Sequence, residues 1–428
     1  ERMTGMTGKD GREAGMGMAQ LYGWATGPRK ALGRFDALEP PKTIDEMYAC
    51  AADENERQAI HDMLFGSAMD VIDRYVPDKE RHAVIRGMLA FLAVNSTYRG
   101  PYTPGSATCL AFALAMPEEG GQMTTKIKGG IGALSDHLKK LYLEASREIR
   151  YRANVDKILR YRAKADKMLV ENAKVTGGRL KDGSTVTAPG VVSNLAPDTT
   201  LLDLVGAEHL PSSLVTRLGG RDHRGSYLQI HFALDGLPQY AAPYEFLNEP
   251  GMQMSVGMFG SPESQQRQWD NCRFGAVPDN PALSIQIPTV GDPEMAPEGK
   301  HAASVYVYAF PTEAPREQHG HLKNEMAQVV IDKITKYAPN FKDIAIRNIT
   351  FAPYHMNTMF GAPNGDFCQG LLQPELMGPN RPGPKGFLDE PIPIEGLYLG
   401  GAGCHGGPGI TFIPGYNAGY QVLADAGR

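Results

Sequence analysis

Apolar residues recur at helical spacing between residues 43 and 94. Thr43-Ile44-Asp45-Glu46 has the form of a capping box, in which a Thr side chain accepts a hydrogen bond from the backbone N–H three residues later. The pattern predicts helices over residues 43–75 and 78–94. The next segment, 95–109, contains two prolines and two glycines and is predicted to be a loop. Residues 1–42, rich in Gly, Met and Arg without a sustained period, are predicted to be irregular.

β-Branched and aromatic residues then form two groups of predicted strands. The first group covers 175–180, 185–187 and 191–194, with Asp182-Gly183 as a hairpin turn between its first two members. The second covers 227–234, 283–287, 304–310 and 344–351, with a helix at 322–337 before its last strand. Strands interrupted by one long helix favour a mixed sheet in a second domain.

Two further patterns lie before the first strand group. Lys128-Gly129-Gly130-Ile131-Gly132 opens a helical pattern that continues through Leu134, Leu138 and Leu141. Residues 150–159 are echoed at once by 160–169, as Arg-Tyr-Arg-Ala-Asn-Val-Asp-Lys-Ile-Leu and Arg-Tyr-Arg-Ala-Lys-Ala-Asp-Lys-Met-Leu. Only one copy of this repeat has room in the strand that leads into residues 170–172.

Composition narrows the class of protein. The 428 residues are 42% hydrophobic with a net charge of −5, which supports large cores and gives no electrostatic reason to expect nucleic acid as a partner. The five cysteines form no CxxC pair, so neither a zinc site nor a disulfide framework is predicted. The longest apolar runs are far shorter than the roughly 20 residues of a spanning helix, so we expect a soluble or peripheral protein.

A glycine cluster near the C-terminus carries the most chemical information. A predicted buried strand, 397–399, is followed by ten residues of which six are glycine, and Pro414 stands where a helix can begin. Residues 401–406 match the G-x-G-x-x-G dinucleotide pattern, but that fingerprint requires a further parallel strand for which the remaining 22 residues leave no room.

A strand, a glycine loop and a helix in this order can bring backbone amides against a flat or phosphorylated ligand. The partial positive charge of the helix N-terminus suits a reduced flavin and stabilises its negative edge by about 1 kcal/mol. The alternative is a glycine-rich turn that serves tight packing only.

Five segments carry a resemblance to a known family. They are PYTPGSA at 101–107, KGGIGAL at 128–134, LKDGSTVTAPGVVSNLAP at 180–197, YAPNF at 337–341 and LYLGGAGCHGGPGITFIPGYNA at 397–418. In this order they resemble the phytoene-desaturase-like flavoproteins, including the pyridine nucleotide-disulphide oxidoreductase domain-containing protein 2 group, within the amine-oxidase-type FAD superfamily.

The resemblance implies a mixed α/β and α+β fold, in which a Rossmann-like FAD/NAD(P)-binding domain interleaves with a substrate domain of mixed sheet and helices. It places the FAD-binding domain at 126–200 and 388–428, and the substrate or lid domain at 43–125 and 201–387. Family members begin with a strand, a true G-x-G-x-x-G turn and a helix that hold the FAD diphosphate. Nothing before Lys128 matches that segment, so we expect it to be missing from this sequence.

The resemblance also implies the site residues. Gly401, Ala402, Gly403, His405, Gly407 and Ile410 line the flavin, and His405 is the catalytic candidate, with a loop histidine bonded to backbone as the alternative. Val155 matches the adenine-contacting strand position, with Ala165 as its rival in the second repeat copy. Ser193 and Asn194 end the strand beneath the cofactor. Gln369 replaces a family histidine. No metal site is predicted.

The implied activity is FAD-dependent removal of a hydride equivalent from a hydrophobic small molecule. Seven residues are candidates for the wall of its pocket, with an ordinary place in the core as the alternative: Tyr98, Arg99, Tyr102, Tyr354, His355, Phe360 and Phe367. Two other functions stay open: a flavin-free scaffold that keeps the fold, and an amine oxidase with Tyr416 and Tyr420 as an aromatic pair. We expect a cytoplasmic or mitochondrial matrix location; peripheral membrane contact and homo-oligomer formation stay open.

Overall fold

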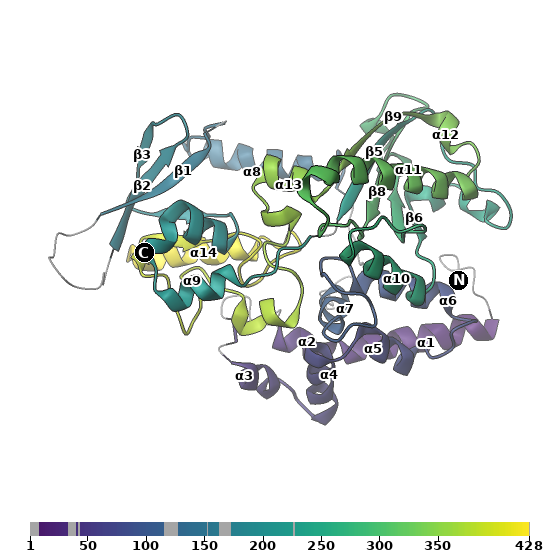
Figure 1. Cartoon of the computed structure of the whole chain (residues 1–428), viewed down its shortest axis with the longest axis horizontal. Coiled ribbons are helices and arrows are strands. Elements are labelled where there is room, and N and C mark those ends of the chain that lie inside the picture. Colours follow the sequence, from purple (N-terminus) through teal and green to yellow (C-terminus); the bar gives the residue numbers. More distant parts are fainter. Residues whose placement is uncertain are drawn as a thin grey trace.

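The computed structural model describes residues 8–32, 40–41, 43–114, 127–151, 153–161, 173–225 and 227–427 (Figure 1). The described helices are α1 (Gly8–Trp24), α2 (Thr26–Ala31), α3 (Ile44–Ala49), α4 (Glu54–Phe65), α5 (Ala68–Tyr75), α6 (Ala83–Ala93), α7 (Ala107–Leu114), α8 (Gly132–Glu144), α9 (Ser212–Gly219), α10 (Pro262–Arg273), α11 (His319–Tyr337), α12 (Phe341–Ile344), α13 (Pro353–Phe360) and α14 (Ile413–Asp425). The described strands are β1 (Val155–Tyr161), β2 (Ala173–Leu180), β3 (Thr185–Thr187), β4 (Val191–Ser193), β5 (Leu228–Leu234), β6 (Ser255–Met258), β7 (Leu283–Gln286), β8 (His301–Val307), β9 (Ala345–Phe351), β10 (Ile394–Glu395) and β11 (Leu397–Leu399).

The first seven helices pack around one apolar core at the lower right of Figure 1. Helices α3 to α6 confirm the prediction for 43–94, and Thr43 caps α3 by accepting from the Glu46 N–H. The prediction of an irregular segment over 1–42 was wrong, because α1 and α2 lie within it. A Cβ at Gly17 would lie 2.3 Å from the Tyr75 backbone oxygen, so this glycine permits close helix packing instead of breaking α1.

The five-stranded sheet of the structure, called sheet C below, has the strand order β6-β7-β8-β5-β9. All of its neighbouring strands pair antiparallel. The prediction of a mixed sheet was therefore wrong. Helix α11 connects β8 to β9, which run parallel to each other, but β5 lies between these two strands and is antiparallel to both. A crossover helix indicates parallel neighbours only when the strands it joins are adjacent.

One face of sheet C is apolar and packs with α11 in a second core. Leu228, Ile230, Phe232 and Leu234 alternate on β5 toward this core, as expected for a strand with one buried face. The intervening residues of β5, Gln229 and His231, point to the opposite face and are half-buried. The sheet therefore presents a polar and aromatic face away from α11.

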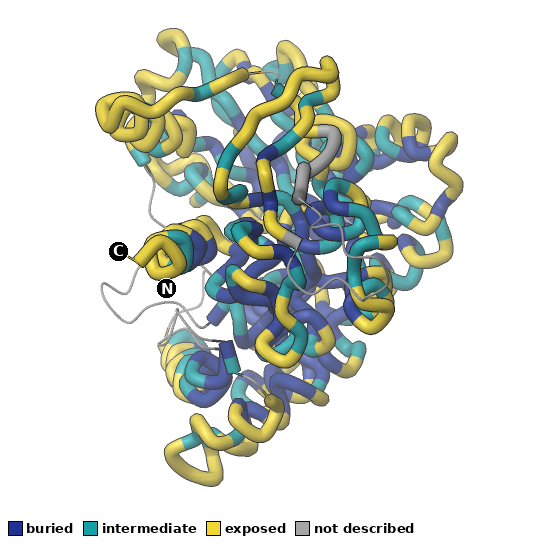
Figure 2. Tube along the Cα trace, turned by 90° about the vertical axis from the view of Figure 1, so that its left-hand side faces the viewer, coloured by how far each residue is buried: buried dark blue, intermediate teal, exposed yellow. Residues whose placement is uncertain are grey.

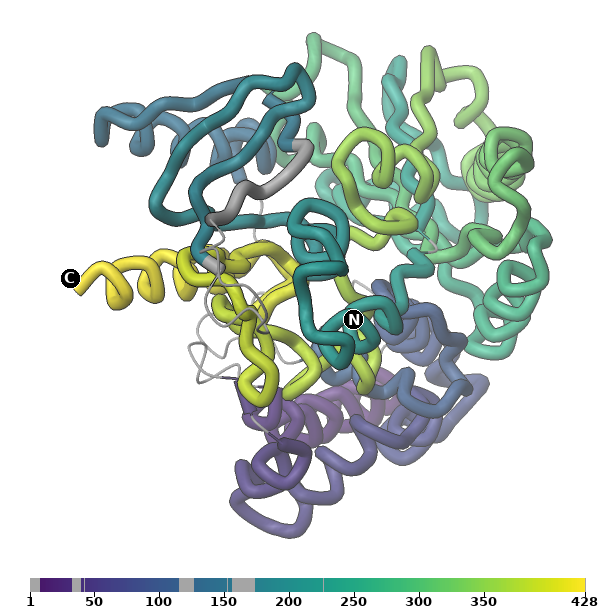
Figure 3. The backbone as a smooth tube through the Cα atoms, turned by 60° about the vertical axis from the view of Figure 1, so that its left-hand side comes forward, coloured from purple at the N-terminus to yellow at the C-terminus, as the bar shows by residue number. Residues whose placement is uncertain are grey.

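The C-terminal segment returns to strands that lie far earlier in the sequence. β10 pairs parallel with β2, and β11 pairs parallel with β4. β2 and β3 form the predicted hairpin, with Gly183 at a positive φ in its turn. Figure 3 shows the yellow C-terminal segment running beside the teal strands before α14 extends outward. β1 uses the first copy of the ten-residue repeat, and most of the second copy lies outside the described residues.

Helices α8 and α14 have large exposed apolar surfaces. No residue of α8 is buried, and Leu138, Leu141 and Leu143 are all exposed. α14 buries Pro414, Asn417 and Ala418 and leaves its other side to solvent, as the helix at the C label in Figure 2 shows. Across the described ranges, no helix combines the length and apolarity that a membrane crossing needs.

Candidate cofactor and substrate site

The glycine loop connects β11 to α14, as the sequence predicts. α14 begins at Ile413 after Phe412, which has left-handed backbone geometry and gives the helix no side-chain cap. Thr411 fixes this entry: its Oγ1 donates to the Gly406 carbonyl at 2.7 Å and accepts from the Ile413 N–H at 3.3 Å. A helix N-terminus without a carboxylate cap keeps its partial positive charge available to an anionic group.

The inner half of this loop packs on the protein's own backbone. A Cβ added at Gly401 would lie 2.3 Å from the Asn194 oxygen, and one at Gly403 would lie 2.5 Å from the Gln369 oxygen. At Gly407 the nearest atom, at 2.6 Å, is the oxygen of Ala402. Close packing within the chain therefore accounts for these three glycines, and their contact with a cofactor stays a prediction.

The outer half of the loop is open. Ile410 is 67% exposed, and the neighbouring Gly409 and Phe412 are exposed as well. All three have positive φ, at +112° for Gly409, +58° for Ile410 and +63° for Phe412. This conformation is strained for a β-branched residue such as Ile410, and strain of this kind persists only where the surrounding structure enforces it. The solvent-exposed residues of this loop are thus Gly409, Ile410 and Phe412.

We expect Gly401→Ala to lower the free energy of unfolding by about 1–3 kcal/mol, because the added methyl group overlaps the Asn194 carbonyl. Urea unfolding measures this loss. Gly415→Ala in α14 is the matched control, since its Cβ meets nothing within 4 Å, and it should be neutral or slightly stabilising. Equal stability of the two variants would contradict the packing role of Gly401.

The other predicted cofactor residues are dispersed around this loop. Ser193 is buried on β4, and its Oγ lies 2.7 Å from Thr200 Oγ1. Asn194 is exposed, and its backbone oxygen accepts from Gln369 Nε2 at 2.9 Å. Val155 lies on β1 opposite Leu180, on a different sheet from the loop, and its rival Ala165 lies outside the described residues.

His405, the predicted catalytic residue, is only 3% exposed. Its backbone N–H donates to the Pro382 carbonyl at 2.8 Å, which holds the loop against the preceding Pro-rich segment. This burial favours the interpretation as a loop histidine over direct contact with a substrate. Ala402, the remaining predicted loop residue, is half-buried, and its carbonyl accepts from Arg381 Nη2 at 2.7 Å.

A buried charged network lies behind the loop. His223 Nδ1 lies 2.8 Å from Asp366 Oδ2, and His223 Nε2 lies 3.1 Å from Asp198 Oδ1. Burial alone would lower the pKa of His223, but the hydrogen bonds and charges of the two carboxylates outweigh it and raise this pKa to about 9. Asp366 also accepts from the backbone N–H groups of Cys368 and Gly370. The network therefore fixes the segment that carries Gln369.

Arg381 joins this segment to the glycine loop. Its guanidinium is buried and donates to five backbone carbonyls, those of Cys368, Gly370, Leu376, Ala402 and Cys404, at 2.7–3.4 Å. Gln369 adds a second connection, because its Nε2 donates to Asn194 and its Oε1 accepts from the Gly403 N–H at 3.1 Å. The carbonyls of Ala402 and Cys404 are thus turned inward, toward Arg381.

Sequence reasoning missed His223, Arg381 and Asp198. Arg381 bonds to backbone carbonyls, and His223 pairs with Asp198 and Asp366, which lie more than 20 positions away in the sequence. A local sequence pattern records neither kind of partner. The one available signal was Arg381 itself, a charged residue inside the Pro- and Gly-rich run 378–386. A long cationic side chain in such a loop is well suited to satisfy the carbonyls that irregular backbone leaves unpaired.

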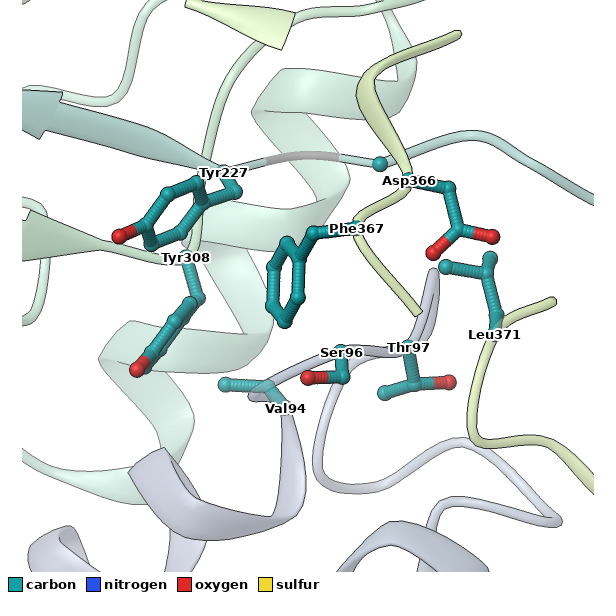
Figure 4. A pocket seen from close by; sticks show the side chains of 9 residues that line it. Val94, Ser96, Thr97, Tyr227, Tyr308, Asp366, Phe367 and Leu371 are labelled. Atoms are coloured by element: carbon teal, nitrogen blue, oxygen red, sulfur yellow. The ribbon is translucent and has the colours of Figure 1, made fainter. Parts of the chain in front are cut away.

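A small cavity lies between sheet C and the segment that leads to Gln369 (Figure 4), and its volume of about 10 Å³ leaves room for about one water molecule. Its lining combines aromatic and small polar groups: Val94, Ser96, Thr97, Gly225, Tyr227, Tyr308, Asp366, Phe367 and Leu371. Figure 4 shows the Tyr227 and Phe367 rings side by side, and their centroids lie 5.2 Å apart. Of the seven predicted pocket residues, only Phe367 lines this cavity.

The other six predicted pocket residues lie elsewhere. Tyr98 lines a separate, open groove with Arg224 and Trp269, and Arg99 pairs with Glu375. Tyr102 donates to Glu263 Oε1 at 2.7 Å. Tyr354 and His355 stack on each other at 3.9 Å, and Phe360 is exposed at the end of α13.

Tyr416 and Tyr420, the aromatic pair of the amine-oxidase alternative, contact each other with centroids 4.5 Å apart on the exposed side of α14. Packing into a core therefore does not explain them. Two exposed rings of this kind can contact either a bound ligand or the surface of another protein segment that packs on α14.

The donor groups around the loop fit an FAD only in part. The outer loop is exposed at Gly409, Ile410 and Phe412, and the start of α14 offers a positive dipole to the anionic edge of a flavin, with its Ile413 N–H already bound to Thr411. The inner loop offers no such space, since its glycines face Asn194, Gln369 and Ala402. Residues 409–413 would therefore hold the group.

Comparison with known proteins finds relatives of this chain. No family model matches it. It is 28% identical over 348 residues to pyridine nucleotide-disulfide oxidoreductase domain-containing protein 2 of Rattus norvegicus, covering 80% of this chain and 58% of the relative. It is 25% identical to the chloroplastic prolycopene isomerase of Daucus carota and 26% identical to the lycopene-forming phytoene desaturase of Pseudescherichia vulneris, covering 70% and 67% of this chain and 44% and 53% of those relatives. The chain thus spans less than two thirds of the length of each.

Solved structures support the fold. A putrescine oxidase bound to putrescine superposes with a TM-score of 0.54 at 10% identity, over 99% of this chain and 77% of that one. An oxidoreductase from Methanosarcina mazei gives a TM-score of 0.50 at 15% identity, over 90% of this chain and 75% of that one. The mixed α/β fold is therefore structurally similar to that of these two proteins. The chain is a homologue of pyridine nucleotide-disulfide oxidoreductase domain-containing protein 2 and of the phytoene desaturase and prolycopene isomerase family, as its sequence motifs indicate.

Proposed function

We propose that the protein is an FAD-dependent oxidoreductase that removes a hydride equivalent from a C–C or C–N bond of a small organic substrate. The observation that carries this proposal is the exposed loop around Ile410 at the N-terminus of α14, which no carboxylate caps. When bound, FAD supplies the hydride acceptor. The chain's part is to bind and orient: its outer loop and helix dipole hold the anionic edge, and Arg381 and Gln369 fix the loop from behind.

The aromatic cavity lies close to the glycine loop, but its volume of about 10 Å³ is too small for a substrate in this conformation. Phe367 is two residues before Gln369, so the cavity and the glycine loop are attached to the same rigid segment. Tyr227 packs against both Tyr308 and Phe367 at this cavity, with ring centroids 5.7 and 5.2 Å apart. The Asp366 carboxylate at this cavity is already bound to His223 and to two backbone N–H groups, so we assign it a positioning role.

A second candidate function, a flavin-free protein that keeps the fold, is favoured by one observation. The three glycines at 401, 403 and 407 pack against the chain's own atoms and need no cofactor to explain them. The same packing makes a Gly403 variant a poor test of flavin binding, because its effect on folding would remove a cofactor in either case.

Titration of FAD into the protein expressed from its complete reading frame tests the proposal. We expect a bound flavin spectrum, and Ile410→Glu should weaken binding at least about tenfold, because a carboxylate beside the α14 N-terminus repels an anionic ligand and satisfies the dipole itself. Ile410 is exposed, so this change removes no core contact.

Ile346→Glu on the edge strand β9 is the matched control, since Ile346 is 60% exposed and lies on sheet C. It should leave FAD affinity unchanged. Absence of flavin binding by the wild-type protein would favour the flavin-free function, and equal effects of the two variants would remove the proposed contact.

A further inference from the structure

An open groove of about 590 Å³ lies beside α10. Helix α10 contacts both α6 and the core of sheet C, since Gln265 Nε2 donates to the Gly87 carbonyl at 2.8 Å and Cys272 packs in that core (Figure 1). The volume is in the range of small-molecule sites, roughly 300–1,000 Å³. Three aromatic and three charged side chains line the groove: Tyr98, Trp269, Phe274, Arg224, Arg273 and Glu313.

Rings and guanidinium groups form a continuous row along the groove. The guanidinium carbon of Arg224 lies 4.3 Å from the Tyr98 ring centroid, and the Tyr98 ring meets Trp269 edge-on at 6.3 Å. The guanidinium carbon of Arg273 lies 4.8 Å from the Trp269 centroid and 4.7 Å from that of Phe274. These side chains come from the loop between α6 and α7, the segment between α9 and β5, and the end of α10, so only folding brings them together.

The two arginines of the groove differ in what they bind. Arg224 uses all three of its guanidinium nitrogens, because Nε and Nη2 donate to Asp222 at 2.9 Å and Nη1 donates to Glu313 at 3.0 Å. Arg273 lies 3.6 Å from Asp270, and its guanidinium makes no hydrogen bond within the described residues. The N–H donors of Arg273 are therefore available to a ligand.

The surroundings of Arg273 suit a carboxylate that is attached to a ring. A guanidinium over an aromatic ring keeps its N–H edge available, and this edge can donate two parallel hydrogen bonds to a carboxylate. Trp269 and Phe274 place ring surface beside this guanidinium, and Phe274 is 76% exposed. An aromatic carboxylate can therefore pair with the cation and cover an exposed ring at the same time.

The charges at the opposite end of the groove limit the ligand to a single anionic group. Two carboxylates, Asp222 and Glu313, share the one cation of Arg224, so that end carries an excess of negative charge. Asp270 and the partial negative charge at the C-terminus of α10 weaken the attraction of Arg273 for anions but leave its donors unused. A second carboxylate on the ligand would approach Glu313 and be repelled.

We propose that this groove binds an aromatic monocarboxylate, with the carboxylate on Arg273 and the ring against Trp269 and Phe274. None of the residues that line the groove belongs to the glycine loop, so this is a second site, distinct from the one proposed for FAD. The inference goes beyond the proposed function. Its assay is a binding measurement without added flavin, so it stands or fails separately from FAD binding.

Three probes that share one ring system test the ligand class: 2-naphthoate, the neutral 2-naphthamide and naphthalene-2,6-dicarboxylate. Their dissociation constants are measured by ligand-observed NMR on the wild-type protein. We expect 2-naphthoate to bind at least about tenfold more tightly than 2-naphthamide, the gain expected for a charge-assisted pair. The dicarboxylate should bind no more tightly than 2-naphthoate, because its second carboxylate meets Glu313.

Two variants at exposed positions locate the site. Arg273→Gln should weaken 2-naphthoate about tenfold and leave the affinity for 2-naphthamide within about twofold, because only the carboxylate uses the cation. Phe274→Ala should weaken both probes about three- to tenfold, because both rings lose the same contact.

Arg267→Gln is the matched control, because Arg267 is exposed on the same helix and does not line the groove. It should leave both affinities unchanged, and thermal melting should show that all three variants are folded. Equal affinity of the wild-type protein for 2-naphthoate and 2-naphthamide, tighter binding of the dicarboxylate, equal effects of Arg273→Gln and Arg267→Gln, or no binding of 2-naphthoate at millimolar concentration would each overturn the proposal.

Discussion

Arg381→Met should lower the free energy of unfolding by at least about 3 kcal/mol, the largest effect that we expect from a single substitution. The guanidinium is 2% exposed and serves five backbone carbonyls, two of which belong to the glycine loop. Methionine fills a similar volume but donates no hydrogen bond, so these carbonyls would stay buried without their partner. Urea unfolding followed by circular dichroism measures the loss.

Two variants sharpen this test. Arg381→Lys should recover less than half of the lost stability, because one ammonium group cannot reach carbonyls that the planar guanidinium serves from three nitrogens. Arg347→Met, at an exposed position on β9, should stay within about 0.5 kcal/mol of wild type. A loss below about 1 kcal/mol for Arg381→Met would show that the five carbonyls find other partners.

The His223 network should make stability depend on pH in one direction. Its folded pKa, about 9, is raised above the ordinary value of 6.5, so its contribution is complete below about pH 6.5 and is lost as pH rises through 9. A shift of this size corresponds to about 3 kcal/mol. Unfolding free energies of the wild-type protein between pH 6 and pH 9.5 measure this decline.

His223→Gln keeps hydrogen-bonding capacity but removes the titrating charge, so the gap in stability between this variant and wild type should shrink as pH rises. His321→Gln on the exposed side of α11 should leave the wild-type profile unchanged. A gap that stays constant from pH 6 to pH 9.5 would mean that His223 is not held in its charged form between Asp198 and Asp366.

Short sequence patterns correctly predicted the elements that are held by interactions between residues close together in the sequence. The Thr43 cap, the Asp182-Gly183 hairpin and the strand, glycine loop and helix at the C-terminus were each encoded in a few adjacent residues. They were confirmed because capping, turn geometry and side-chain alternation act over short distances.

The errors arose where distant partners decide the structure. Residues 1–42 were predicted to be irregular, although a close approach to Tyr75 makes glycine the suitable residue at position 17 of α1. The strand pairing of sheet C depends on β5 lying between β8 and β9, which no periodicity reveals. Arg381 and His223 form their contacts with backbone and carboxylates brought together only by the fold.

The return of the C-terminal strands has a consequence for synthesis of the protein. Leu397 pairs with Val191 across about 200 residues, so β4 cannot gain this neighbour until β11 has been synthesised and has left the ribosome. Sheet C and the helical core, whose members are closer in sequence, are free to assemble earlier. During that interval β4 is an unprotected edge, and we expect chaperones that shield unpaired strands to raise the yield of native protein more than those that act on helical regions.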